Sequence, residues 1–193
     1  MDLPACHAAA LDVTAATVAG IGADQWALPT PCDGWDVRYL LNHIVTGNLW
    51  VPELVGGRTI EDVGDTLDGD RLGNDSVGAY SASAASAAAA FAAAGAMDAP
   101  CAVSYGPVPG SVYCGHRLID VLVHGWDLAA ATRQDTSLPE ELCAACLEVL
   151  EPQKEELLAS GAFGTFVAAP AASGAQTVLL GTLGRSPSWA PPR

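Results

Sequence analysis

Four polar residues that could do chemistry interrupt the otherwise apolar segment RLIDVLVHGWDLA. They are Arg117, Asp120, His124 and Asp127, at spacings of three, four and three residues. On a helix this spacing places all four on one face, in a stripe about 15 Å long. A buried carboxylate without a partner costs several kcal/mol, so the stripe must line a wet cavity, pair internally or hold a cation.

A metal ion is one candidate for that cation. Asp120 and His124 can direct both donor atoms at one ion, because residues four apart are neighbours on a helix face. A third ligand is offered by His43, in the segment LLNHIV, where an apolar residue would be the default. Gly47, one turn further on, is expected to leave the space beside that imidazole empty. Two imidazoles and one carboxylate are typical of a catalytic divalent-metal site, in which the metal lowers the pKa of bound water or ionises a bound thiol.

Simpler structural roles stay open for the same residues. Asp120 and His124 could form only an intrahelical hydrogen bond, and Arg117 could close an ion network with Asp120 or Asp127. Asp127 is expected to be a supporting acid rather than a ligand. If Arg117 is not tied to Asp127, it could hold an anionic group of a substrate. The nearby tryptophans are interpreted as packing or pocket-wall residues: Trp35, Trp50 and Trp126. The other two histidines, His7 and His116, are interpreted as structural or surface residues.

Helical periodicity dominates the chain that must position these residues. Helices are predicted over about residues 3–21, 37–50, 75–97 and 112–131, with a fifth after Pro139 that Pro152 could kink, and a short one in the tail. Asp36 is the predicted N-cap of the second helix. The acidic stretch after Pro52 is interpreted as surface loop, and residues 98–111 as a loop in which a strand would have no obvious partner. The fold class is therefore all-α, a four-helix bundle in one domain over 1–193, with additional short C-terminal helices.

Composition excludes several classes of partner. A formal net charge of −14 argues against nucleic acid and membrane surfaces, which need clustered Lys and Arg. The chain has no apolar run of roughly 18 to 20 residues and no basic segment at its N-terminus, so we expect a cytoplasmic protein. The six cysteines, including the CxxC of Cys143 and Cys146, are expected to be reduced.

The stretch LPTPCDGWDVRYLLNHIVTGN and, about seventy residues later, RLIDVLVHGWDLAAAT resemble the metal-binding domain of mycothiol-dependent maleylpyruvate isomerases and the wider DinB-like superfamily. The likeness is strongest to its short actinobacterial metal-binding members, and the closing LLGTLGRSPSW is similar to their end. The resemblance implies a divalent metal, usually zinc, on His43, Asp120 and His124. In the isomerases the carboxylate is a Glu, whereas this chain has the shorter Asp120. The isomerases also carry a C-terminal domain that this chain is too short to include, so maleylpyruvate isomerisation itself is not expected.

The combined expectation is an enzyme whose metal ion, zinc by that resemblance, activates a small thiol such as mycothiol. The thiol would be transferred to, or isomerise, an electrophilic small molecule in a natural-product or detoxification pathway. Catalytic residues are unassigned, apart from support by Arg117 and Asp127. Two alternatives stay open: a non-catalytic metal or small-ligand binding protein, and a metal-free catalyst using His43 and His124 as acid and base. The Ala-rich third helix could pack within the bundle or against a second copy in a homodimer.

Overall fold

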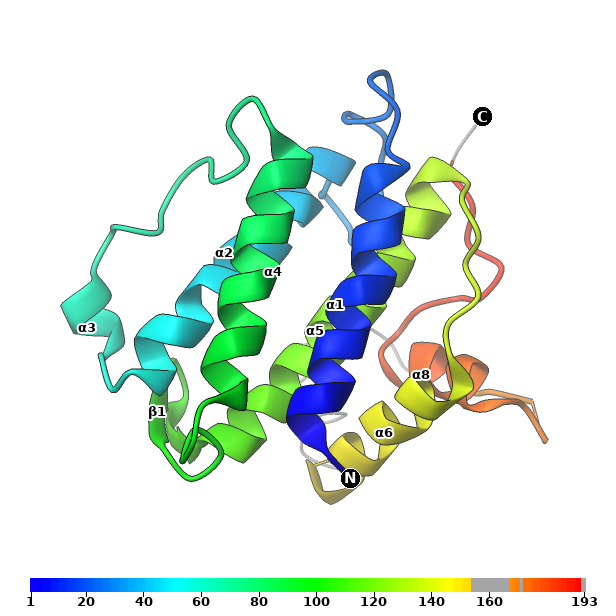
Figure 1. Ribbon diagram of the computed structural model, residues 1–193. Helices are drawn as coiled ribbons and strands as arrows, with labels where there is room; N and C mark the ends of the chain where they lie inside the picture. Colours follow the sequence, from blue (N-terminus) through cyan, green and yellow to red (C-terminus); the bar gives the residue numbers. More distant parts are fainter. Residues whose placement is uncertain (154–166, 171, 192–193) are drawn as a thin grey trace.

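The computed structural model describes residues 1–153, 167–170 and 172–191, and it is mostly helical (Figure 1). The elements are α1 (Leu3–Ala19), α2 (Val37–Val55), α3 (Ile60–Val63), α4 (Ser76–Ala92), β1 (Pro100–Val103), β2 (Gly106–Pro109), α5 (Gly110–Thr132), α6 (Glu140–Leu150), the 3-10 helix η1 (Glu151–Gln153) and α8 (Ala175–Thr182). The predicted helical class and the six predicted helices are confirmed. The four-helix-bundle arrangement stays a prediction.

Aspartate side chains begin three of the long helices. Asp36 Oδ1 accepts a hydrogen bond from the backbone N–H of Tyr39 at 2.8 Å, which confirms the predicted N-cap of α2. Asp2 caps α1 and Asp75 caps α4 in the same way. Each cap satisfies a backbone N–H that the helix itself leaves unpaired, and such caps typically contribute about 1 kcal/mol. The start of α2 is thus fixed, and with it the direction in which its side chains point.

The end of α2 differs from the prediction. The helix continues through Pro52 to Val55 instead of ending near residue 50. Proline removes one intrahelical hydrogen bond, but Val51 and Leu54 on either side of it are buried, so packing holds the last turn in helical form. The acidic connection that follows also contains the short helix α3, which a capping box of Thr59 and Asp62 begins.

The prediction of a loop over residues 98–111 is wrong for the centre of that segment, because β1 and β2 form an antiparallel hairpin there. Cys101 pairs with Val108 and Val103 with Gly106, so the two strands are joined by a two-residue turn. Gly106 has a φ of +120°, a conformation open mainly to glycine. Each strand finds its partner within the segment itself, and no distant strand is needed.

α5 lies at the centre of the core. α1 packs along α5 and α4 along α2 (Figure 1). The side chains of Leu118, Leu122 and Leu128 are fully buried, as expected for a helix that is apolar on most of its sides. Close approach to α1 is possible at Gly125, where a Cβ atom would lie 2.3 Å from Thr14 Oγ1. The central helix is therefore held rigidly from more than one side.

The C-terminal elements return to the core. α6 packs against α8, and Gln176 of α8 donates to the carbonyl of Thr136 at 2.8 Å and accepts from the N–H of Leu138 at 3.0 Å. After Leu150 the chain passes into η1, and the course of a kink beyond Pro152 lies outside the described residues. The segment after α8 then runs back toward α5.

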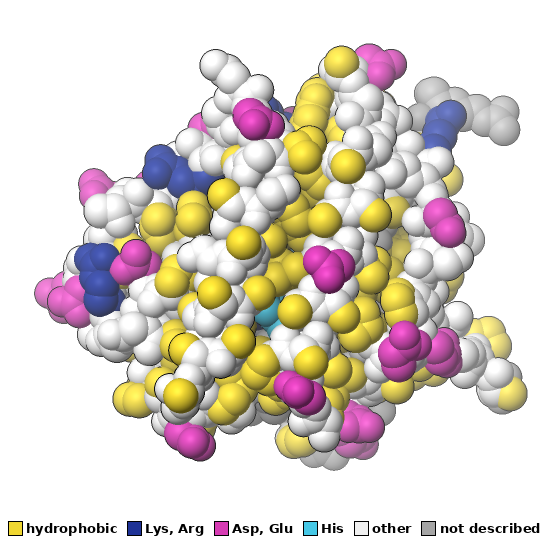
Figure 2. All heavy atoms as spheres, viewed as in Figure 1, with side chains coloured by type: hydrophobic (Ala, Val, Ile, Leu, Met, Phe, Trp, Pro, Cys, Tyr) yellow, Lys and Arg dark blue, Asp and Glu magenta, His cyan; other side chains and the backbone are white. Residues whose placement is uncertain are grey.

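The molecular surface carries the negative charge in a scattered form. Figure 2 shows many apolar side chains on the face made by α1 and α4, with acidic side chains spread among them. All six cysteines are free, as expected. Within the part of the chain that the structure describes, no helix is both long and apolar enough to cross a bilayer.

Candidate metal centre

The structure brings His43 of α2 together with Asp120 and His124 of α5. The Nε2 atoms of His43 and His124 lie 3.2 and 3.5 Å from Asp120 Oδ1. The two imidazole rings are 5.1 Å apart between centroids and nearly perpendicular, at 82°. Ligand atoms from the three residues all lie within 4.8 Å of one another. This is the set singled out from the sequence, and the binding of an ion there stays a prediction.

Solvent reaches this cluster from the side of α2. The side chain of His43 is 36% exposed and that of Asp120 is 25% exposed, whereas His124 is 13% exposed. The ring of Trp35 covers both imidazoles, with centroids 5.0 Å from His43 and 6.0 Å from His124. Trp35 therefore forms a wall of the site, as its sequence context predicted, and leaves one side open to a small molecule.

Arg117 is committed to the interior. Its Nη1 donates to Asp120 Oδ2 at 2.7 Å and its Nη2 donates to Asn48 Oδ1 at 3.1 Å. The predicted ion network thus closes on Asp120. The expectation that the space beside His43 is empty is wrong, because the Arg117 guanidinium occupies the room that Gly47 provides. With a side chain 9% exposed and these partners, Arg117 is not placed to hold an anionic substrate.

The charge of Asp120 is set by its neighbours. Burial alone would raise the pKa of this carboxyl group, but the Arg117 guanidinium and the two imidazoles more than offset burial and hold the pKa well below its usual range. Asp120 is therefore an anion, with Oδ2 on Arg117 and Oδ1 facing the two histidines. An anionic oxygen between two imidazole nitrogens is a suitable donor set for a divalent cation.

The other nitrogen of His124 meets a second carboxylate. Its Nδ1 lies 2.9 Å from Oδ2 of Asp127, whose side chain is fully buried. Burial lowers the pKa of His124, but Asp120 and Asp127 outweigh that effect and raise the pKa above its ordinary value. Metal-binding histidines commonly donate their second N–H to a carboxylate, which fixes the ring orientation. The pairing fits both the predicted supporting role of Asp127 and a metal-facing Nε2.

Two residues near Asp127 were not expected at the site. Cys32 Sγ donates to Asp127 Oδ2 at 3.3 Å, and Arg185 Nη2 donates to the same oxygen at 2.9 Å. Cys32 belongs to the segment TPCDGWD, whose resemblance was noted, and Arg185 to LLGTLGR. A charged residue in a largely apolar tail was the available signal for Arg185, but nothing local indicates its partner.

A second group of potential ligands consists of Cys32, His124 and Asp127. The Arg185 guanidinium lies 3.4 Å from Cys32 Sγ and 2.9 Å from Asp127 Oδ2, so a cation already neutralises this group. The group that contains His43 and Asp120 is also more exposed. Of the two, it is the better position for an exchangeable metal ion.

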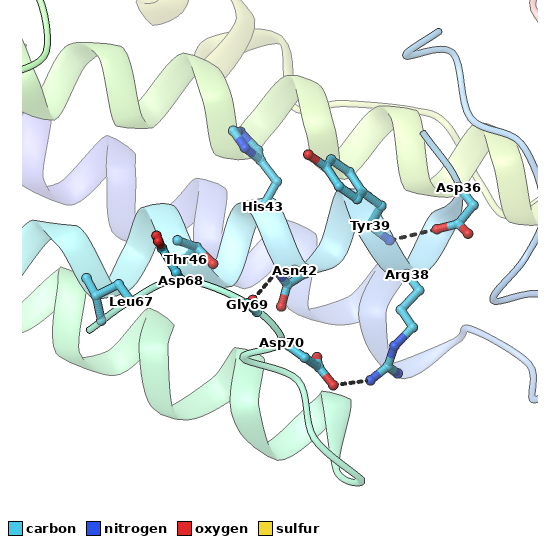
Figure 3. Close-up of a pocket in the computed structure, with 10 residues that line it drawn as sticks. All are labelled: Asp36, Arg38, Tyr39, Asn42, His43, Thr46, Leu67, Asp68, Gly69 and Asp70. Carbon is cyan, nitrogen blue, oxygen red and sulfur yellow. Dashed lines mark hydrogen bonds and ion pairs between the residues drawn. The ribbon is translucent and has the colours of Figure 1, made fainter. Parts of the chain in front are cut away.

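A groove of about 610 Å³ opens beside His43 (Figure 3). One wall is the exposed face of α2, and the other is the segment 67–70, which Asn42 holds by donating to the carbonyl of Gly69 at 3.0 Å. The groove is lined by Asp36, Arg38, Tyr39, Asn42, His43, Thr46, Leu67, Asp68, Gly69 and Asp70. The one guanidinium among these residues, that of Arg38, is paired with Asp70 at 2.7 Å. The lining is therefore acidic overall.

Comparison with known proteins gives two kinds of match. A family model described as the mycothiol maleylpyruvate isomerase N-terminal domain matches residues 7–129, a range that includes the three candidate ligands. Two uncharacterized proteins of Mycobacterium tuberculosis, from strains CDC 1551 / Oshkosh and H37Rv, are each 41% identical to the chain over 157 residues. Each alignment covers 79% of this chain and 82% of the relative. No solved structure matches the chain significantly.

Proposed function

Because the chain belongs to the mycothiol maleylpyruvate isomerase N-terminal domain family, we propose that it is a divalent-metal-dependent enzyme acting on a small thiol. The thiol, mycothiol in this proposal, is transferred to an electrophilic small molecule or promotes its isomerisation. The helices α1, α2, α4 and α5 form the DinB-like bundle that carries the site. The observation that supports the proposal most is the convergence of His43, Asp120 and His124 beside an open groove.

In this proposal the ion is zinc, held by the two imidazoles and by Asp120. When bound, zinc lowers the pKa of a coordinated thiol, so that the nucleophilic thiolate is present near neutral pH. Arg117 keeps Asp120 ionised and in place through its 2.7 Å hydrogen bond. Asp127 fixes the ring of His124, and Trp35 shields the imidazoles from water on one side. The side chain of Asp120 is shorter than the Glu of the isomerases, but its carboxylate still contacts both histidines directly.

The charge of the groove indicates the class of electrophile. Arg38 is paired with Asp70, and Arg117 and Arg185 are buried against other carboxylates. Among the described residues that line the groove, no cation is left to bind a carboxylate. Apart from the proposed metal ion, a substrate with several carboxylates would therefore meet a lining with net negative charge, from residues such as Asp68. We propose a neutral or cationic electrophile.

One observation favours a second candidate, a metal-free acid–base catalyst. Asp120 already has a cationic partner in Arg117, and its other oxygen lies within 3.5 Å of two imidazoles that could exchange protons with a substrate. In that case His43, the more exposed of the two, would be the group that meets the substrate.

Metal analysis and a conjugation assay test the proposal together. The purified protein is stripped with a chelator, reloaded with zinc, and assayed with mycothiol and a neutral alkylating electrophile. We expect about one zinc per chain and a rate enhancement that requires the metal, as a single three-ligand site implies. His124→Ala should abolish both. His116→Ala is the matched control, since His116 lies on the same helix but contacts Tyr105 of the hairpin instead.

The possible outcomes separate the candidates. Zinc binding without conjugation would indicate a binding protein rather than an enzyme. Conjugation that is equally fast in the stripped protein, yet lost in His43→Ala, would indicate the metal-free catalyst. If His124→Ala binds zinc and reacts as the parent does, the proposed centre is wrong.

A further inference from the structure

Arg185 lies in the segment that follows α8, outside the residues that the family model matches. Figure 1 shows this segment, coloured orange to red, returning alongside α5 after α8. The backbone N–H of Arg185 donates to the carbonyl of Leu180 at 2.8 Å, and its Nη1 donates to the carbonyl of Leu183 at 2.8 Å. The backbone and the side chain of Arg185 are thus both anchored to the end of α8.

The rest of the guanidinium faces Asp127, and Nη2 also donates to Cys32 Sγ at 3.4 Å. Nη2 donates to Oδ2 at 2.9 Å, and Nε lies 3.4 Å from Oδ1, so the arginine faces both carboxylate oxygens. The side chain of Asp127 is fully buried and that of Arg185 is 11% exposed. A buried carboxylate is costly unless a cation neutralises it, and Arg185 supplies that positive charge from a distant part of the chain.

Asp127 passes this constraint to the candidate metal centre. Its Oδ2, which receives the bond from Arg185, is also the oxygen that lies 2.9 Å from His124 Nδ1. With Asp127 fixed, the imidazole of His124 has one favoured orientation, in which Nε2 faces Asp120 at 3.5 Å. Without Arg185, Asp127 would lose its guanidinium partner and keep its contacts with His124 Nδ1 and Cys32 Sγ, so the carboxylate could rotate away from the imidazole.

We propose that Arg185 is a positioning residue, which fixes the ring of His124 through Asp127 and thereby sets the metal affinity of the site. The C-terminal segment is thus a functional part of a centre whose ligands all lie within residues 7–129. The metal readout rests on the proposed function. The orientation of the His124 ring does not, because it is a property of the protein with or without an ion.

Metal affinity is the first test. Cobalt(II) is titrated into stripped parent protein and into Arg185→Met, Arg185→Lys and Arg133→Met. Arg133 is the control, since it is an exposed arginine at the end of α5 that carries no assigned role. We expect Arg185→Met to bind cobalt about 10- to 100-fold more weakly, as is usual when a supporting partner of a metal ligand is lost. Arg185→Lys should recover part of the loss, and Arg133→Met should match the parent.

A double-mutant cycle separates positioning from general stability. If Arg185 acts through Asp127, then Arg185→Met should weaken cobalt binding little further in protein that already carries Asp127→Asn. Losses that multiply independently, or an Arg185→Met affinity equal to that of the parent, would overturn the proposal. The thermal midpoint of each variant is recorded, and Arg185→Lys serves in place of Arg185→Met if the latter does not fold.

A metal-free readout keeps this inference distinct from the proposed function. In protein with ¹⁵N-labelled histidine, the Nδ1 proton of His124 that faces Asp127 should exchange slowly with solvent. Arg185→Met or Arg185→Lys should speed this exchange at least tenfold, whereas Arg133→Met should not change it. If the parent binds no metal but the exchange responds in this way, the metal function fails and the positioning role stands. An unchanged proton signal in both Arg185 variants would show that Arg185 does not hold the ring.

Discussion

The guanidinium of Arg117 on α5 fills the space where a side chain of residue 47 on α2 would lie: a Cβ atom on Gly47 would be 2.3 Å from Arg117 Nη1. The missing side chain lets the guanidinium pass between the two helices. From there it donates to Asp120 on one side and to Asn48 on the other. A glycine within a helix is unfavourable by itself, so this position trades helix propensity for room beside the candidate ligand.

Gly47→Ala should therefore destabilise the protein, although the same change in an open helix would stabilise it by about 1 kcal/mol. The new methyl group must displace Arg117, which leaves Asp120 without its cation and Asn48 without its donor. We expect a loss of about 2–3 kcal/mol in the free energy of unfolding, measured by urea denaturation. In an Arg117→Met background the same alanine should be neutral or stabilising. Equal effects in both backgrounds would show that Arg117 is not the group displaced.

The helices could be predicted from the sequence because they depend on local spacing, and local spacing also singled out the three residues that the structure brings together. Asp120 and His124 share a face of α5 simply by being four residues apart, and His43 stood out as a polar residue in an apolar run. Their meeting point further required α2 to pack beside α5, which family resemblance indicated and periodicity alone did not.

The contacts that sequence reasoning missed are set by tertiary packing. Arg185 is 58 residues from Asp127, and 153 residues separate it from Cys32. No period relates such positions. Gly47 was expected to leave an empty space, whereas Arg117 fills that space, because a single sequence does not say which distant side chain enters it. The hairpin was missed because a strand in residues 98–111 was expected to have no obvious partner, whereas its partner is the next strand of the same segment.

The burial of His7 predicts that the folded protein loses stability in mild acid. Its ring is fully buried against Phe91, with 5.0 Å between centroids, and neither ring nitrogen has a hydrogen-bond partner among the described residues. Burial, helped by the charge of Arg117, lowers the pKa of His7 from 6.5 to about 3. Below pH 6.5 the unfolded chain therefore binds a proton at His7, whereas the folded chain does not bind it until the pH approaches 3. Stability is fully present above pH 6.5 and is lost as the pH falls toward 3.

Between pH 6.5 and 5, this difference amounts to about 2 kcal/mol in the free energy of unfolding. His7→Leu should remove that part of the pH dependence, as measured by urea denaturation at several pH values. At pH 7.5 the variant should be as stable as the parent or more so, since it removes two unsatisfied polar atoms. A variant whose stability falls with pH as steeply as that of the parent would assign the acid sensitivity to other groups.

The segment 67–70 forms the wall of the groove opposite α2. Its position should depend on the hydrogen bonds of Asn42 far more than on the Arg38–Asp70 ion pair. Asn42 donates to the carbonyl of Gly69 at 3.0 Å and accepts from the N–H of Arg71 at 2.7 Å. Asn42→Ala leaves both backbone groups without this partner, and we expect it to cost about 1–2 kcal/mol. The amide of Arg71 should then exchange faster in hydrogen-exchange experiments. Arg38→Met is the comparison, because the Arg38–Asp70 pair has side chains 42% and 53% exposed and should contribute less than about 1 kcal/mol.

Thiol labelling should divide the six cysteines into two classes. Cys6 and Cys32 are partly exposed, whereas the other four are buried, and burial raises the pKa of Cys114 to about 12 and that of Cys143 to about 11. Since the thiolate is the reacting form, an aromatic disulfide reagent should modify at most two thiols in the native protein and all six after unfolding in urea. Mass spectrometry of the partly labelled protein identifies them. Early labelling of Cys114 or Cys143 would mean that α5 and α6 open locally far more readily than their packing indicates.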